Sequence, residues 1–485
     1  MINFRQAQGE TIAVDRDRVD ALRASLRGSL LLPTDPGYDV ARTLWNSMID
    51  RHPAAIVRPA GAADVIQTVR FAREHRVLLA VKGGGHNIAG KAACDDGLML
   101  DLAAMRSVRV DPVAQRARVE PGALLADFDR ETQAFGLSTP TGINSTTGMA
   151  GLTLGGGFGW QSRKRGLTID NLVGVDVVLA SGELVQANAE RNSDLFWALR
   201  GGGGNFGIVT SFEYRLHPLG PEVLAGLVVY PLDQAHAVFE GYRRFTADAP
   251  HEMTAWLVLR QAPPLPFLSP AMHGKEVVVI AFCWIGEIDR GNELAARLRS
   301  FGKPAGEQIG PMPFAAWQTA FDPLLAPGAR NYWKSHDFKA LNGDVERIVC
   351  DAILRLPSGE CEAFIGHLGG AVNRVPAGET AYPHRDVEFV INVHTRWREP
   401  RDDARCIGWA RGLFDALTPH ATGGVYVNFM PEDETQRVAA GAYGPNYARL
   451  AQLKANYDPD NLFCLNQNIL PQASAPGRSA DRVAA

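Results

Sequence analysis

Three glycine clusters stand out in the sequence and could hold an anionic ligand. They lie at residues 83–85, 155–159 and 201–204, and each is followed by polar side chains. Because glycine has no Cβ atom, successive backbone N–H groups in such loops can form an anion-binding concavity. Lys82, directly before the first cluster, would add a fixed positive charge. The pattern predicts loops that grip a phosphate-bearing cofactor; the alternative is that the glycines only make tight turns.

Two familiar phosphate motifs are almost present, and both fail on context. Residues 85–92 have the glycine and lysine spacing of a P-loop, but Ala92 stands where the motif needs Ser or Thr to bind Mg²⁺. Residues 202–207 match the G-x-G-x-x-G dinucleotide fingerprint. They follow a helical pattern at 194–200 and precede a strand pattern, whereas the Rossmann motif needs the strand first. We therefore expect neither motif to act in its usual way.

The glycine clusters together resemble the cofactor loops of a known family. Residues 81–90, Val-Lys-Gly-Gly-Gly-His-Asn-Ile-Ala-Gly, are similar to the flavin-attachment loop of the berberine-bridge-enzyme-like FAD-linked oxidases, in the vanillyl-alcohol-oxidase superfamily. Segments 141–159 and 196–210 resemble the second and third FAD loops, and segment 457–469 resembles the closing segment. These motifs occur in the family's order, and the resemblance runs from about residue 30 to 471.

The resemblance implies an FAD attached covalently through His86. His86 matches the histidine that bonds the flavin 8α-methyl group, whereas Asn144 stands where many relatives carry the cysteine of a second bond. An amide cannot form that thioether, so we expect single attachment. Lys82 stands where many relatives carry arginine, and we expect it to contact the pyrophosphate as a point charge. The other residues that the resemblance places at the FAD are Gly83, Gly84, Gly85, Asn87, Gly90, Thr141, Gly142, Ser145, Thr147, Gly148, Gly151, Leu152, Asn205, Gly207, Ile208, Val209, Asn466 and Asn468.

One position in the second loop bears on the reaction with O₂. The resemblance places Thr147 beside the C4a–N5 edge of the flavin, where a small residue leaves room for O₂ and leucine closes the space. Threonine has nearly the volume of valine, so this position predicts an oxidase. Met149 could fill the same space instead, because methionine adapts to irregular gaps.

A long strand pattern carries two candidate substrate residues. In residues 387–397 the odd positions are mostly apolar and the even ones include Glu388, Asn392, His394 and Arg396, which predicts a strand with one polar face. On that face Asn392 matches a position that is often a substrate-facing glutamine in relatives. His394 shares the face, and we favour an ordinary structural histidine there.

Tyr426 is the candidate catalytic base. Residues 425–429 resemble a family strand whose tyrosine contributes to the active site, and Tyr426 would share a face with Asn428. A phenol can act as a general base if a nearby positive charge lowers its pKa. The alternative is a half-buried sheet tyrosine without a chemical role.

The elements that must position these residues change in character along the chain. Residues 1–50 are expected to be a helical lead-in, followed by short strands and helices in irregular alternation. Beyond Pro218 the patterns predict longer strands. The clearest expected strands are 56–59, 77–81, 98–102, 116–119, 173–179, 254–260, 277–284 and 387–397, and the clearest helices are 62–74 and 123–135.

These patterns and the resemblance together predict an α+β fold. It comprises a PCMH-type FAD-binding domain of two α/β subdomains and a substrate domain with an antiparallel sheet backed by helices. The expected boundaries are 1–217 for the FAD-binding domain (core 50–217), 218–434 for the substrate domain, and 435–485 for a C-terminal segment that completes the first domain. We expect the tail from 473 to 485 to be frayed.

Composition narrows the classes of function. The chain has 485 residues, 46% hydrophobic and 21% charged, with a net charge of −4, which favours a large globular core and gives no broad surface for nucleic acid. No segment approaches a membrane span, and the first residues lack the pattern of a signal peptide. The six cysteines are widely spaced with no C-x-x-C pair, so we expect no metal and a cytoplasmic protein.

The predicted function is an FAD-dependent oxidase. A hydride would leave an alcohol or amine carbon of a small organic substrate, and O₂, the expected electron acceptor, would become H₂O₂. The alternatives are a dehydrogenase on the same scaffold, a natural-product biosynthetic oxidase and, least favoured, a binding module. The sequence leaves the substrate, the catalytic base and the oligomeric state open.

Overall fold

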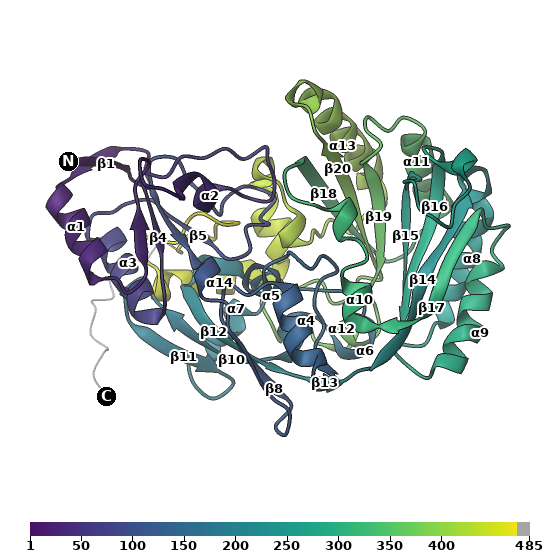
Figure 1. Cartoon of the computed structure of the whole chain (residues 1–485), viewed down its shortest axis with the longest axis horizontal. Coiled ribbons are helices and arrows are strands. Elements are labelled where there is room, and N and C mark those ends of the chain that lie inside the picture. Colours follow the sequence, from purple (N-terminus) through teal and green to yellow (C-terminus); the bar gives the residue numbers. More distant parts are fainter. Residues whose placement is uncertain (473–485) are drawn as a thin grey trace.

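The computed structural model describes residues 1–472 of the chain, and the tail expected to be frayed lies outside them. Its α+β fold, with sheets of four, five and seven strands, confirms the expected class. In Figure 1 the two smaller sheets lie in the purple and blue N-terminal part, and the largest lies in the green part. A search of the described helices for a membrane-crossing apolar stretch finds none.

The four-stranded sheet carries the first glycine loop at the end of one strand. Its order is β3–β4–β6–β5, with β3 antiparallel to β4 and the other pairs parallel. Strand β5 ends at Lys82, so the loop leaves from its C-terminal edge. The elements of this part are β3 (Ser29–Leu31), β4 (Ala55–Arg58), β5 (Leu79–Lys82), β6 (Leu98–Asp101), α1 (Arg16–Ser25), α2 (Tyr38–Arg42) and α3 (Ala62–Glu74).

The expectation of a helical lead-in over residues 1–50 was wrong at its start. The chain opens with a hairpin of β1 (Ile2–Arg5) and β2 (Thr11–Val14) before α1 begins. Phe4 is fully buried and meets Phe71 of α3 edge-on, with 6.0 Å between ring centroids. Strands of four residues show too few alternations for their period to be seen in the sequence.

The five-stranded sheet is antiparallel throughout and carries the third glycine loop. Its order is β11–β10–β12–β8–β7, and β12 begins at Ile208, just beyond the loop. Trp197 of α7 and Leu450 of α14 share its hydrophobic core, so the C-terminal segment (yellow in Figure 1) packs here. The domain boundaries expected after residues 217 and 434 remain predictions. The elements are β7 (Val108–Asp111), β8 (Arg116–Val119), β10 (Leu172–Val178), β11 (Leu184–Asn188), β12 (Ile208–Arg215), α4 (Leu125–Gln133), α5 (Met149–Leu154), α6 (Ser162–Arg165), α7 (Ser193–Leu199), α14 (Tyr447–Tyr457) and the short pair β9 (Leu137–Ser138) and β13 (His217–Pro218).

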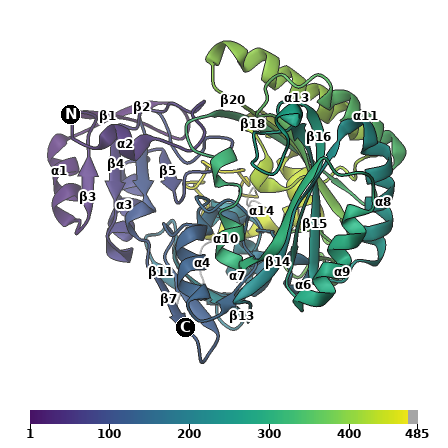
Figure 2. The ribbon, with the colours of Figure 1, turned by 45° about the vertical axis from the view of Figure 1, so that its right-hand side comes forward.

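The seven-stranded sheet is antiparallel, with order β17–β14–β16–β15–β19–β20–β18. Figures 1 and 2 show helices α8, α9, α11 and α13 on its outer face, away from the N-terminal part. The elements are β14 (Glu222–Pro231), β15 (Met253–Gln261), β16 (Glu276–Trp284), β17 (Gly306–Pro313), β18 (Arg330–Phe338), β19 (Glu362–His367), β20 (Phe389–Trp397), α8 (Ala235–Asp248), α9 (Ile288–Arg299), α10 (Phe314–Gln318), α11 (Gly343–Ile353), α12 (Ala371–Arg374) and α13 (Asp403–Leu417).

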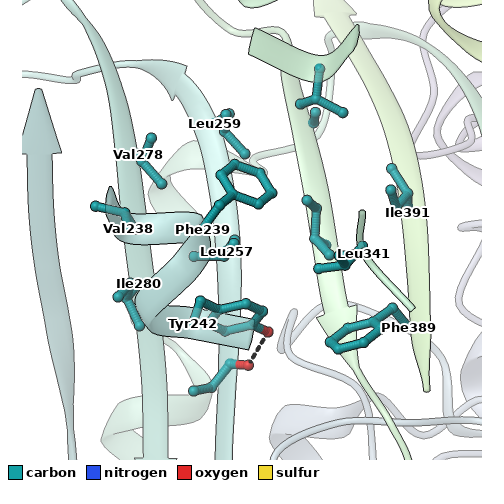
Figure 3. Close-up of a cluster of buried hydrophobic side chains, with 14 of the residues drawn as sticks. Val238, Phe239, Tyr242, Leu257, Leu259, Val278, Ile280, Leu341, Phe389 and Ile391 are labelled. Atoms are coloured by element: carbon teal, nitrogen blue, oxygen red, sulfur yellow. Dashed lines mark hydrogen bonds between the residues drawn. The ribbon is translucent and has the colours of Figure 1, made fainter. Parts of the chain in front are cut away.

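The hydrophobic core between this sheet and its outer helices determines which strand residues face the N-terminal part. Figure 3 shows Val238, Phe239 and Tyr242 of α8 packed against alternate residues of the strands. The Tyr242 hydroxyl donates a hydrogen bond to the carbonyl of Ala255 at 2.7 Å, which satisfies its one polar group. Because strand side chains alternate, burying Ile391 on the outer face turns its neighbours toward the N-terminal part.

Two segments that were expected to be strands differ from the expectation, one in its burial and the other in its conformation. Residues 389–397 form β20 as expected, and all nine are buried, because the polar face is covered by the rest of the molecule instead of by water. Residues 425–429 are not a strand: Val427–Phe429 is a turn of 3₁₀ helix, and Tyr426 directly precedes it. The apolar alternation of this segment arises from a loop buried between the sheets.

Candidate active site

One cavity of about 360 Å³ lies where the glycine loops meet the inner face of the seven-stranded sheet. That volume is within the usual range for small-molecule sites. Most of the predicted site residues reach its wall, and loops and sheet therefore line a single site. These residues are Gly83, Gly84, Gly85, His86, Asn87, Gly142, Asn144, Thr147, Gly148, Gly151, Leu152, Gly207, Ile208, Val209, Asn466, Asn392 and Tyr426.

The first two loops touch each other backbone to backbone. A Cβ atom added to Gly84 would lie 2.4 Å from the nitrogen of Gly148, and one added to Gly148 would lie 2.4 Å from the nitrogen of Gly84. Any side chain at either position would force the backbones apart. Glycine at these two positions therefore lets the two loops close together along one side of the cavity.

The side chain of His86, in the first glycine loop, is held by an aromatic contact and a hydrogen bond. Its ring stacks on Trp45, with 4.8 Å between centroids and 20° between planes, and its Nε2 lies 3.0 Å from Oγ1 of Thr146. Burial lowers the pKa of His86 to about 3, because desolvation disfavours the charged ring. The imidazole is therefore neutral at ordinary pH.

The partners of Thr146 decide which nitrogen of His86 is free. Oδ1 of Asn144 accepts hydrogen bonds from the backbone N–H of Thr146 at 3.1 Å and from its hydroxyl at 2.8 Å. The Thr146 hydroxyl has given its hydrogen to Asn144, so it accepts from Nε2–H of His86. In the neutral ring the lone pair is then on Nδ1.

Six predicted cofactor residues do not line the cavity: Lys82, Gly90, Thr141, Ser145, Asn205 and Asn468. Two of them have clear structural partners. Ser145 hydrogen-bonds through its backbone N–H and hydroxyl to the carboxylate of Asp322. Asn205 donates to the carbonyl of Gln467 at 3.1 Å and accepts from the N–H of Ile469 at 2.9 Å, which ties down the C-terminal segment.

Lys82 differs most from its predicted role. Its ammonium donates to the carbonyl of Ala41 at 2.5 Å and lies 3.4 Å from Oδ1 of Asp101 on β6. On β5 it is Leu79 and Val81 that face the cavity, so alternation turns Lys82 to the other face. The expectation that Lys82 contacts the pyrophosphate is therefore not supported.

Lys91 is the cation that the cavity wall contains. It is the only lysine or arginine among the described lining residues. Its Nζ donates to the carbonyl of Asn466 at 2.7 Å and lies 3.3 Å from Oε1 of Gln467. The sequence analysis met Lys91 only as part of a rejected P-loop pattern.

Tyr426 lines the cavity without the charge that a tyrosine base needs. Its hydroxyl oxygen accepts from the backbone N–H of Gly157 at 2.9 Å and from Nδ2 of Asn428 at 3.1 Å, and both donors are neutral. Burial raises the pKa of Tyr426 to about 12. The structure therefore places Tyr426 at the site but removes the condition under which it was expected to act as a base.

A row of side chains crosses the inner face of the sheet on four adjacent strands. Arg260 (β15) is opposite Glu362 (β19), Glu362 is opposite His394 (β20), and His394 is opposite Trp333 (β18). Nη1 of Arg260 lies 2.7 Å from Oε2 of Glu362, whose Oε1 lies 3.1 Å from Nδ1 of His394. Trp333 meets the His394 ring edge-on at 4.7 Å.

The carboxyl group in the middle of this row is ionised. Burial alone would raise the pKa of Glu362, but Arg260 and the His394 hydrogen bond outweigh it and lower that pKa to about 2. Glu362 and Arg260 were missed in the sequence analysis because no local pattern shows that positions 102 residues apart are paired. The polar face predicted for residues 387–397 was the one sequence feature that pointed to this row of side chains.

Aromatic side chains form most of the remaining sheet side of the cavity. Trp256 and Phe364 meet edge-on at 5.1 Å, and Trp333 and Phe429 at 5.6 Å. All four line the cavity. Flat apolar walls of this kind suit a flat apolar ligand.

Comparison with known proteins agrees with this architecture. The FAD binding domain family matches residues 53–188, and the berberine and berberine-like family matches residues 425–470. A FAD-linked oxidoreductase of Dictyostelium discoideum is 34% identical over 88% of this chain and 91% of its own length. The (R)-6-hydroxynicotine oxidase of Paenarthrobacter nicotinovorans is 30% identical over 93% of this chain and 98% of its own.

A solved structure shows the same fold. The crystal structure of 6-hydroxy-D-nicotine oxidase from Arthrobacter nicotinovorans superposes with a TM-score of 0.81 at 27% identity, covering 92% of this chain and 99% of that one. The fold and the matched domains define an FAD-linked oxidoreductase. The chain belongs to the berberine-bridge-enzyme-like family of these enzymes.

The cavity wall has the chemistry that an FAD requires. Glycine backbone from all three loops, the ammonium of Lys91 and an apolar stretch around Ile208 and Phe463 line one continuous space. Glycine-rich backbone and a cation suit the pyrophosphate. Asn466 lines the same wall, and its Oδ1 is buried without a partner among the described residues. The residues present therefore fit the cofactor that the family binds.

Proposed function

We propose that the protein is an FAD-dependent oxidase of a compact small molecule. The bound FAD would accept a hydride from an alcohol or amine carbon and pass the electrons to O₂, giving H₂O₂. The observation that carries this proposal is the meeting of His86, on a glycine loop, with the polar inner face of β20 around one cavity. The proposed attachment residue and the candidate substrate-facing groups therefore line the same space.

The chain's own residues support covalent attachment through His86 alone. The nucleophile in such a bond must be a neutral ring nitrogen, and the hydrogen bonds of Thr146 leave Nδ1 of His86 with the lone pair. Trp45 holds the ring plane. Asn144 lines the same wall but is held by Thr146 and has no thiol to form a second bond.

An open approach for O₂ is supported by two residues of the second loop. Thr147 lines the cavity with a side chain smaller than leucine. Met149, the alternative filler of this space, is fully buried in the core of the five-stranded sheet and does not line the cavity. These placements favour an oxidase over a dehydrogenase.

A peroxide-coupled screen of the purified yellow protein tests the proposal. Aromatic alcohols, cyclic amines and sugars should be compared, each with O₂ and with the dye dichlorophenolindophenol as acceptor. We expect peroxide with an aromatic alcohol or amine. Turnover with the dye and none with O₂ would show a dehydrogenase, and protein purified without flavin would contradict the proposal altogether.

We also propose that the enzyme acts in the cytoplasm. All six cysteines are free in the structure, as expected for a reducing compartment. Fractionation of the source cells would test this, and recovery of the protein outside the cytoplasm would contradict it.

A further inference from the structure

The far nitrogen of His394 has no partner. Nε2 is buried, and no described residue hydrogen-bonds to it. The same is true of Oδ1 of Asn392, two residues earlier on the same strand face. Both side chains line the cavity and are no more than 5% exposed. Buried polar atoms are nearly always paired, so these two atoms point to a ligand that supplies the missing partner.

The contacts of Glu362 with Arg260 and His394 determine whether Nε2 of His394 is a hydrogen-bond donor or an acceptor. Ionised Glu362 can only accept hydrogen bonds, so the 3.1 Å contact with His394 requires the hydrogen to be on Nδ1. Arg260 already balances the charge of Glu362, so nothing in the row requires the ring to be charged. In the neutral ring Nε2 then carries the lone pair, and it is a buried hydrogen-bond acceptor on a residue that lines the cavity.

We propose that His394 Nε2, with the Asn392 amide beside it, binds the O–H or N–H group of a hydroxylated aromatic or N-heteroaromatic substrate and accepts its proton. The ring of the substrate would lie among Trp256, Trp333 and Phe364. Glu362 and Arg260 are positioning residues, because they act on the substrate through His394. This inference rests on the proposed oxidase function and names the substrate class of that site.

The proposed step balances. The O–H or N–H proton moves to Nε2. Where a saturated carbon bears that group, this carbon would lose its hydride to the flavin of the proposed function. Where a ring carbon bears the group, the hydride would leave a carbon attached to the ring in conjugation with it, and the ring π electrons would form the double bond to that carbon. The electron pair of the O–H or N–H bond forms the new C=O or C=N bond. His394, now carrying both ring protons, releases one to solvent when the product leaves. The hydrogen bond from Nδ1–H to Glu362 strengthens when the ring becomes charged, which favours the proton's arrival.

Phenol and anisole are matched probes for this site, because they differ in the O–H group and the ring carbon that bears oxygen carries no hydrogen in either. Calorimetric titration of the flavin-containing protein should show phenol binding at least about threefold more tightly, the value of one neutral hydrogen bond. His394→Phe should remove the preference. The control His336→Phe, a buried histidine of β18 stacked on Phe414 on the other face, should retain it. Equal binding of the probes, no binding of phenol, or a preference that survives His394→Phe would overturn the proposal.

A second variant keeps the test decisive if His394→Phe folds poorly. In Glu362→Gln, Arg260 should draw the amide oxygen and leave the NH₂ group facing His394. The tautomer would then invert, Nε2 would carry the hydrogen, and the preference for phenol should fall although the imidazole stays in place. A purely structural role of Glu362 would leave the preference unchanged, which would contradict the proposal.

These outcomes are separable from failure of the oxidase function. Flavin content and peroxide formation test the proposed function directly, without reference to His394. A yellow, peroxide-forming enzyme that does not distinguish phenol from anisole would keep the oxidase and remove this inference. A protein without flavin that still prefers phenol through His394 would remove the oxidase proposal and keep the binding role of His394.

Discussion

The cavity has two walls that are built in opposite ways. The residues of the loop wall come from three contiguous segments, within 83–87, 142–155 and 203–209, and are rich in glycine. The sheet wall, Trp256, Trp333, Glu362, Phe364, Asn392 and His394, offers side chains from four strands. Backbone contacts suit a cofactor that is the same throughout a family. Side chains on strands can be exchanged one at a time, so the sheet wall is where one member can differ from another.

The loop wall could be predicted because its information is local. His86 and its glycines occupy consecutive positions, so the motif was visible before the fold was known. Lys82 shows the limit of such evidence. The motif placed a cation near the cofactor, but the alternation of β5 and the pairing of Lys82 with Asp101 direct that charge away.

The sheet wall could be predicted only in part, because it depends on strand pairing. The alternation in 387–397 placed Asn392 and His394 on one face, and both residues line the cavity in the structure. Nothing local identifies Glu362 as the neighbour of His394, since the pairing of β19 with β20 is set by the whole sheet. The same lack of long-range information made the buried loop at Tyr426 resemble a strand.

The largest expected effect is on the loop wall. His86→Ala should lose all covalent flavin, because the proposed bond forms through Nδ1 of His86 alone. Fluorescence of an acid-treated denaturing gel measures this directly. Asn144→Ala should retain the band, and a band that survives His86→Ala would assign the attachment elsewhere.

The contact between the first two loops gives the next largest effect. Gly84→Ala places a Cβ atom 2.4 Å from the nitrogen of Gly148, and backbone cannot yield as a flexible side chain can. We expect a loss of about 1–3 kcal/mol in the free energy of unfolding, with lower flavin content. In the control Gly151→Ala the new Cβ meets nothing within 4 Å. Similar urea-unfolding midpoints for the two variants would refute the tight contact.

Variants of two lysines distinguish a charge that lines the cavity, Lys91, from a charge that lies outside it, Lys82. Lys91→Met should weaken FAD binding roughly tenfold, as expected for the loss of about 1.5 kcal/mol from a charged hydrogen bond. Lys82→Met should instead lower the melting temperature, because it removes the ammonium that pairs with buried Asp101 and donates to the carbonyl of Ala41. Flavin content and melting temperature should be measured for both. The opposite pattern would restore Lys82 as the pyrophosphate ligand.

Another expected effect concerns the pH dependence of the sheet wall. The pKa of Glu362 is lowered to about 2 in the folded protein from an ordinary value of 4.5. Its contribution to stability is therefore complete above pH 4.5 and is lost as pH falls toward 2. The difference in unfolding free energy between wild type and Glu362→Gln should shrink over this range, by on the order of 1–3 kcal/mol. The exposed pair of Glu307 with Arg299 offers the control Glu307→Gln, for which the difference should stay near zero.

Air oxidation of the reduced enzyme tests most directly whether the two walls enclose an oxidase site. The flavin is photoreduced without air, and the enzyme is mixed with air-saturated buffer in a stopped-flow instrument. We expect wild type to reoxidise faster than free reduced flavin, and Thr147→Leu to be about tenfold slower, a cost of about 1.4 kcal/mol, with anaerobic reduction by substrate unchanged. Wild-type reoxidation no faster than that of free reduced flavin would contradict the account and identify a dehydrogenase.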